Sequence, residues 1–212
     1  MPLFYVHQSP VIGVWKIVEP WQELLDLFQN KTLYADEVLT IHSDKRKSEW
    51  LAVRLLLKHL TGAEMLVDYK DHGAPFLKNY PYNISISHTK GYAALILSKH
   101  TNPGIDIEHR SGRALKLCKK FINTQELEQL NLLLRNHLHD PELFATICWC
   151  AKETAFKALQ ENGVDFIKHF HISPFTLSNK GDILLKETKT HRQESYQIHY
   201  QITDDFIITW KE

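Results

Sequence analysis

The sequence has few cysteines, and they follow no pattern that binds a metal or builds a disulfide framework. Its 212 residues include three, Cys118, Cys148 and Cys150, and no two of them form a CxxC pair. This odd number without a paired spacing argues against a disulfide-stapled fold and against a cysteine-rich zinc site. Free cysteines fit a reducing compartment, where disulfides do not persist.

The sequence also lacks an excess of charge and a long apolar run. Twenty-five Lys and Arg balance twenty-five Asp and Glu, so charge alone would not draw the chain onto nucleic acid or an anionic membrane. The longest apolar stretch, residues 92–97, is far shorter than the roughly 20 residues of a membrane span. The amino terminus carries no basic segment followed by an apolar one. We therefore expect a soluble cytoplasmic protein with no nucleic-acid or membrane partner.

A hydrophobic content of 43% is present, enough for a sizeable core. In the first half, residues 11–18 are rich in β-branched and apolar side chains and predict a strand. Pro20 stands at or near the start of a short helix. A clearer helix begins after Ser43, a plausible N-cap, and ends at Gly62. Beyond a loop, three strand-like segments follow one another, and we predict that they form a meander. These segments are residues 83–87, 92–98 and 104–108.

The second half begins with helical patterns. Residues 114–121 predict a helix, and another begins near Asn123 or Thr124 and runs to about His137. A long helix follows, with Asp140 as N-cap and Pro141 in the first position, and it runs to about Gln160.

From about His171 to Trp210, strand-like segments and turns alternate as in a β-meander. Each half of the chain therefore mixes helices with antiparallel strands, which is typical of an α+β fold. We predict two similar lobes, residues 1–102 and 103–212, each with an antiparallel sheet packed against helices.

Two acidic residues stand close together in the segment GIDIE, residues 104–108. On a strand, Asp106 and Glu108 would point to the same side, about 6.6 Å apart, while Ile105 and Ile107 face the other. Two like charges at this distance repel, and a Mg²⁺ ion between them would relieve the repulsion. From the spacing alone, a solvent-facing strand with ordinary acids is the simpler explanation, because this pattern occurs often by chance.

The long helix carries WCAKETAFKAL, residues 149–159. Trp149, Glu153, Phe156 and Lys157 recur with helical spacing, so an acid and a base share a stripe with two aromatic rings. Either the charged pair has a functional partner, or it is a surface ion pair worth only about 0.3–0.5 kcal/mol.

Further polar groups could contact an anion. Ser87 and His88 end a strand-like segment and could hold a phosphate with the loop backbone, although a polar strand end is the simpler reading. Residues 45–47 place three cations in the first turn of a helix, where the dipole disfavours them. They either face an anionic partner or form a solvated charged turn. Glu126, three residues after Asn123, fits the N3 position of a capping box.

The order and spacing of these segments resemble the 4′-phosphopantetheinyl transferase superfamily, in its longer, two-lobed Sfp-type form. Its G-[IV]-D-[IV]-E motif is matched from Gly104 to Glu108, and its W-x-x-K-E-x-x-x-K motif from Trp149 to Lys157. Ser-His precedes the first motif by about 16 residues. The resemblance spans roughly residues 43 to 160 and implies two α/β subdomains arranged as a pseudo-dimer.

The resemblance implies an enzyme that moves the phosphopantetheine arm of coenzyme A to a serine of an apo acyl or peptidyl carrier protein. The products would be the holo carrier and 3′,5′-ADP, with Mg²⁺, or Mn²⁺ in its place, as cofactor. Asp106, Glu108 and Glu153 would bind the metal. Glu153 or Glu126 would take the serine proton, a choice the sequence leaves open, and Lys157 would stabilise the leaving phosphate.

The same resemblance implies contacts to coenzyme A. Lys152 and Lys157 would meet its phosphates, as would Ser87 and His88, and Lys45 or Arg46 with Arg54 would meet the 3′-phosphate. The resemblance also implies contacts from the family's Gly-Lys-Pro loop, which is here Gly73-Ala74-Pro75. Gly73 and Pro75 would contact coenzyme A, but the lysine over the adenine is missing. Glu49 also stands where many relatives have glycine.

We expect a monomer that docks an acidic carrier protein, with Lys116, Lys119 and Lys120 beside Phe121 as a candidate docking surface. The same lysines are equally well explained as a solvated helix face. Two rival functions remain: a metal-dependent nuclease, which the neutral charge disfavours, and a catalytically inactive relative that binds coenzyme A or a carrier protein. The intact acidic and basic residues of both motifs argue against the latter.

Overall fold

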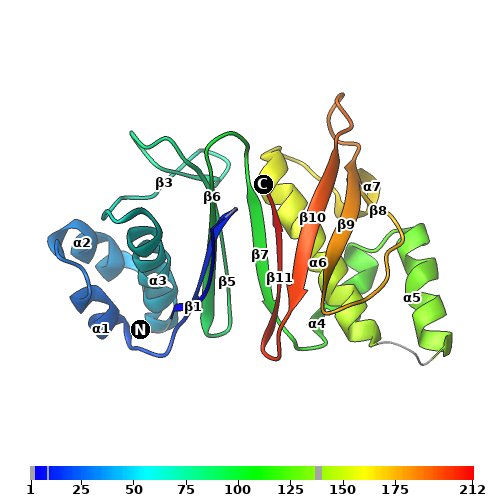
Figure 1. Cartoon of the computed structure of the whole chain (residues 1–212), viewed down its shortest axis with the longest axis horizontal. Helices are drawn as coiled ribbons and strands as arrows, with labels where there is room; N and C mark the ends of the chain where they lie inside the picture. Colours follow the sequence, from blue (N-terminus) through cyan, green and yellow to red (C-terminus); the bar gives the residue numbers. More distant parts are fainter. Residues whose placement is uncertain (1–2, 9, 137–139) are drawn as a thin grey trace. The chain divides into compact units, whose positions relative to one another are not determined.

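A computed structural model of the chain describes residues 3–8, 10–136 and 140–212. The chain forms two compact units: unit 1 extends to Pro103 and also includes Glu212, and unit 2 is residues 104–211. Each unit contains an antiparallel sheet together with helices (Figure 1), which confirms the predicted α+β class. None of the helices in the described ranges combines the length and apolar character needed to cross a bilayer.

Unit 1 is built on a sheet with the strand order β1-β2-β6-β5, in which every neighbouring pair is antiparallel. Helix α3 packs against β2 and β6 and buries an apolar face that includes Leu51 and Leu56. Its elements are β1 (Leu3–Gln8), β2 (Val11–Lys16), α1 (Trp21–Asp26), α2 (Thr32–Thr40), α3 (Asp44–Thr61), β3 (Asp68–Tyr69), β4 (Pro75–Phe76), β5 (Asn83–Thr89) and β6 (Tyr92–Ser98).

The ends of α3 confirm the predicted caps. The Ser43 hydroxyl accepts a hydrogen bond from the Arg46 backbone N–H, and Gly62 ends the helix in the left-handed region, with φ 76°. A glycine adopts this conformation without the steric cost that a Cβ would add.

The predicted meander of three strands is wrong in its third member. Strand β6 already has β5 on one edge and β2 on the other, so it has no edge left for a third neighbour. The segment 104–109 instead forms β7 (Gly104–His109), which pairs with β11 (Phe206–Lys211) in the sheet of unit 2. Sequence neighbours commonly pair, but here a strand from the start of the chain takes the free edge.

Unit 2 has the strand order β7-β11-β10-β9-β8, and all of these pairs are antiparallel. The last four strands confirm the predicted meander, although its first strand is short. The predicted end of one helix near His137 falls outside the described residues. The remaining elements are α4 (Arg113–Leu117), the 3₁₀ turn η1 (Cys118–Lys120), α5 (Thr124–Asn136), α6 (Pro141–Leu159), α7 (Phe166–His169), β8 (Phe170–Ile172), β9 (Lys180–Glu187) and β10 (Ser195–Ile202).

Helix α6 is the central helix of unit 2 and packs against β7, β11 and β10 (Figure 1). Asp140 caps it by accepting hydrogen bonds from the N–H groups of Glu142 and Leu143, and Pro141 opens it, as the sequence predicts. A hydrogen bond of 2.6 Å joins the hydroxyls of Thr154 on α6 and Thr209 on β11. Since both hydroxyls are buried, this bond ties α6 to β11 at a defined position.

Gly104 sets how closely α6 approaches β7, because a Cβ atom at this position would lie 2.1 Å from the backbone oxygen of Thr154. We expect Gly104→Ala to force the helix from the strand and to lower the free energy of unfolding by about 1–3 kcal/mol. Urea denaturation would measure the loss. Gly13→Ala is the matched control, since its Cβ would meet only movable side-chain atoms of Leu56 and Leu60. Equal losses in the two variants would contradict this explanation.

Candidate active site

The acidic face of β7 lies under α6. Asp106 stands opposite Thr209 in the ladder with β11 and is only 5% exposed, while Glu108 is partly exposed. Ile105 and Ile107 alternate with the acids and are fully buried. The alternation of β7 is therefore present as predicted, but the acids point at a helix rather than into open solvent.

Lys157 on α6 reaches down to this acidic face. Its Nζ atom lies 2.7 Å from Oδ1 of Asp106 and donates a second hydrogen bond of 3.0 Å to the carbonyl oxygen of Ile105. The Cys150 thiol, also on α6, interacts electrostatically with Asp106. A buried carboxylate needs such partners, since an uncompensated charge at this depth is strongly unfavourable.

Glu153 has an unusual protonation equilibrium for a glutamate. Burial raises the pKa of its carboxyl to about 7, with further increases from Asp106 and Glu108, while the Lys157 ammonium opposes the shift. The carboxyls of Asp106, Glu108 and Glu153 are therefore close enough to interact electrostatically. A carboxyl with a pKa near neutrality is suited to exchange a proton during catalysis.

These three carboxylates have the chemistry of a magnesium site, because Mg²⁺ prefers hard oxygen ligands. A divalent cation would also offset the repulsion from Asp106 and Glu108, which adds to the effect of burial on the pKa of Glu153. As placed, however, no three His, Cys, Asp or Glu side chains within the described ranges form a group that could hold a metal ion. The ammonium group of Lys157 supplies the positive charge at Asp106 instead.

The cysteines of α6 are buried, which predicts that their thiols react slowly in the native protein. Burial raises the pKa of Cys148 and of Cys150 well above the usual thiol range, with Asp106 adding to the shift at Cys150. Cys118 is partly exposed. Because the thiolate is the reactive form, we expect a thiol reagent to modify only Cys118 in the native protein and all three cysteines after unfolding. Rapid modification of two or three thiols in the native protein would contradict this burial.

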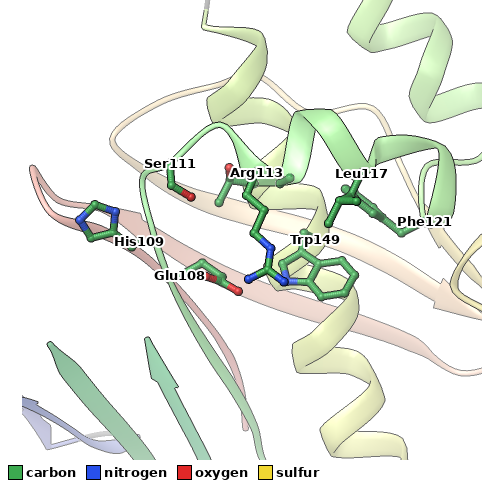
Figure 2. A pocket seen from close by; sticks show the side chains of 9 residues that line it. Glu108, His109, Ser111, Arg113, Leu117, Phe121 and Trp149 are labelled. Carbon is green, nitrogen blue, oxygen red and sulfur yellow. The ribbon is translucent and has the colours of Figure 1, made fainter. Parts of the chain in front are cut away.

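A cavity of about 130 Å³ lies beside Glu108, and Figure 2 shows its lining. Trp149, Leu117 and Phe121 form an apolar wall, and the side chain of Arg113 extends from α4 toward Glu108 and Trp149 (Figure 2). The cavity thus combines apolar surface with a cation and an acid next to the proposed metal ligands. It could receive a narrow chain with polar groups.

The structure places Lys152 and Glu126 away from this site. Lys152 is fully buried and donates to the carbonyls of Phe121 and Phe166 and, at 2.7 Å, to the Glu126 carboxylate. Its three ammonium protons therefore have partners inside the protein. We do not include Lys152 among the phosphate contacts.

Glu126 serves as the capping residue that its spacing predicts. Its carboxylate accepts from the N–H of Asn123, while the Asn123 side chain accepts from the N–H of Glu126. It also accepts from the N–H of Ile172 and is 2% exposed. This enclosure leaves Glu153 as the better candidate base.

In unit 1, several of the predicted coenzyme A contacts line one cavity of about 580 Å³. Arg46, Arg54 and His88 contribute to it, together with Glu49 and Trp50. Lys45 is not among the lining residues but lies 3.6 Å from Glu49. Three other predicted contacts lie outside this lining: Ser87, which is buried on β5, and Gly73 and Pro75, which belong to the β3–β4 hairpin.

Sequence reasoning missed several residues at these sites. Arg113 carried no signal, because a single arginine at a helix start resembles any surface residue. Trp149 was visible as part of the stripe with Glu153 but was given no role. Glu49 had a readable signal, since positions 45, 46 and 49 are helical neighbours and their opposite charges predict ion pairs.

A model of the 4′-phosphopantetheinyl transferase superfamily matches residues 102–211, slightly more than half of the chain. The matched span runs from β7 to β11 and includes all of α6. A comparison with curated proteins gives no match. From this match over unit 2, the chain belongs to the 4′-phosphopantetheinyl transferase superfamily.

Proposed function

We propose that the protein transfers the 4′-phosphopantetheine arm of coenzyme A to a serine of an apo acyl or peptidyl carrier protein, with Mg²⁺ as cofactor and 3′,5′-ADP as the second product. Family membership supports phosphopantetheine transfer in general. The observation that carries the proposal is the acidic group of Asp106, Glu108 and Glu153, with Lys157 against it, inside the matched span. The lengths of the two units favour the two-lobed Sfp-type form, a holo-carrier-protein synthase.

Asp106, Glu108 and Glu153 would hold the metal. When bound, Mg²⁺, or Mn²⁺ in its place, would supply positive charge that offsets the negative charge of the substrate phosphates. Substituting an ion for Lys157 at Asp106 would release that ammonium for another anionic partner. The phosphates of coenzyme A are anionic partners of this kind. In phosphoryl-type transfer, most of the catalysis comes from positioning and from cations that stabilise negative charge.

The protein's own residues then position and move protons. The Glu153 carboxylate would accept the proton of the serine hydroxyl, directly or through a water molecule. The serine oxygen forms a bond to phosphorus as the bond to the 3′,5′-ADP phosphate breaks. Lys157 would stabilise or protonate that departing phosphate.

We propose that unit 1 contributes the nucleotide contacts and unit 2 the metal ligands and the catalytic helix α6. Arg46, Arg54 and His88 line one cavity of unit 1, which supports their assignment to the phosphates of coenzyme A. Lys45 and Ser87 remain proposed contacts. Gly73 and Pro75, at the β3–β4 turn, are proposed to approach the adenine of coenzyme A.

The cavity of Figure 2 supports a place for the phosphopantetheine arm, since its apolar wall suits a narrow chain beside Glu108. Lys116, Lys119 and Lys120 are exposed on α4 and η1, close in sequence to this wall. We propose that they attract an acidic carrier protein, and that the enzyme acts as a cytoplasmic monomer.

The test is to incubate the protein with Mg²⁺, coenzyme A and an apo carrier protein, and to measure the mass of the carrier. We expect a gain equal to the phosphopantetheine arm and release of 3′,5′-ADP in equal amount. Coenzyme A binding without any gain, across fatty acid, polyketide and peptide carriers, would favour the inactive relative. Cleavage of DNA under the same conditions would favour the nuclease.

A further inference from the structure

Glu49 is an acidic residue among the cations assigned to coenzyme A. The residue is 4% exposed, although it lines the cavity of unit 1. Nη1 of Arg46 lies 3.1 Å from its Oε2 atom, and Nζ of Lys45 lies 3.6 Å from its Oε1 atom. A single buried carboxylate thus forms ion pairs with two of the three cations in the first turn of α3.

His88 joins this cluster from β5. Nη1 of Arg46 lies 2.6 Å from Nε2 of His88, and Nδ1 of His88 lies 3.5 Å from Oε2 of Glu49. A guanidinium can only donate, so Nε2 accepts and Nδ1 carries the proton, on the side of Glu49. The carboxylate therefore contacts three of the groups proposed to bind phosphate.

The remaining arginine of the cavity is less accessible than Arg46. Arg54 is 2% exposed, and its guanidinium lies over the Trp50 ring, 3.4 Å from the ring centroid. It also donates to the backbone oxygen of Trp50. Among the described residues that line the cavity, Arg46 is the exposed arginine, and its charge is already shared with Glu49.

We propose that Glu49 is a specificity-determining residue that weakens binding of a terminal phosphate in this cavity, so that the protein distinguishes poorly between coenzyme A and its 3′-dephospho form. The inference rests on the proposed function, because it takes coenzyme A as the ligand. A phosphate that approaches Arg46 also approaches a buried negative charge, and the low local dielectric strengthens their repulsion. Repulsive groups of this kind set specificity as effectively as attractive ones.

The experiment compares adenosine 3′,5′-bisphosphate with adenosine 5′-monophosphate, which differ by the 3′-phosphate alone. Isothermal titration calorimetry on the full chain, without metal, gives the ratio of their dissociation constants. We expect a ratio within about threefold of one for the wild type, and about tenfold stronger preference for the bisphosphate in Glu49→Gln. Glu23→Gln is the matched control, since Glu23 is exposed on α1 and lies outside the cavity.

Glutamine keeps the shape of the side chain, and Glu49→Ala provides a second variant; thermal melting checks that both are folded. An unchanged or reduced preference for the bisphosphate in folded variants would overturn the inference about Glu49. The proposed coenzyme A site would stand, because nucleotide binding would persist. If neither nucleotide binds to wild type or variants, the proposed coenzyme A site fails, and this inference fails with it.

Discussion

Asp106→Asn should lower the rate of phosphopantetheine transfer at least about a hundredfold while leaving the fold intact. The substitution keeps the shape of the side chain but removes the charge that would bind the metal. It also removes the carboxylate that holds the Lys157 ammonium at 2.7 Å. The rate would be measured by the mass gain of the carrier protein, and the fold by circular dichroism.

Asp204→Asn is the matched control for this variant. Asp204 is exposed between β10 and β11 in the same unit, so its substitution makes the same change in charge at an exposed side chain. We expect wild-type transfer from the control. If Asp106→Asn kept more than about a tenth of the wild-type rate, the assignment of Asp106 as a metal ligand would be wrong.

Lys152→Met should have its main effect on stability, with an expected loss of about 3–5 kcal/mol in the free energy of unfolding. Lys152 and Glu126 form an ion pair whose side chains are 0% and 1% exposed. Removing the lysine leaves a buried carboxylate with no opposite charge. Chemical denaturation would measure the loss, and Lys168→Met, at a lysine whose side chain is 75% exposed, is the matched control.

The double variant Lys152→Met, Glu126→Gln distinguishes the effect of an unpaired buried charge from the effect of changed side-chain packing. Since it removes both charges, we expect it to recover part of the stability lost by Lys152→Met. If Lys152 were a phosphate ligand instead, Lys152→Met would lose transfer activity at unchanged stability. That result would contradict the buried position of this lysine.

The boundaries of the main helices could be predicted because local chemistry sets them. Ser43 and Asp140 cap their helices through side-chain oxygens, and Gly62 adopts the left-handed conformation, so each boundary depends on a few adjacent residues. Strand β7 was predicted as a strand but assigned to the wrong neighbours. The alternation of its residues shows which side chains share a face, and says nothing about which strand lies beside it.

In the candidate site, too, some residues could be assigned from the sequence and others depend on tertiary packing. Asp106 and Lys157 could be assigned from their motifs, and they lie in contact. Lys152 was assigned from its motif as well, although it stands one residue before Glu153 and so about 100° away around the helix. That turn places it with Cys148 and Ala155 on the buried face of α6. Helical geometry was therefore available to distinguish the two lysines, whereas the closure of Lys152 by Phe121 and Phe166 depends on tertiary packing.

The most direct test of the account is a crystal structure of the protein with Mn²⁺ and coenzyme A, in which anomalous scattering locates the metal. The account predicts one strong peak with oxygen atoms of Asp106, Glu108 and Glu153 at roughly 2 Å, and with Lys157 moved from Asp106 to a phosphate. A bound metal that contacts none of these carboxylates, with Lys157 still paired to Asp106, would contradict it.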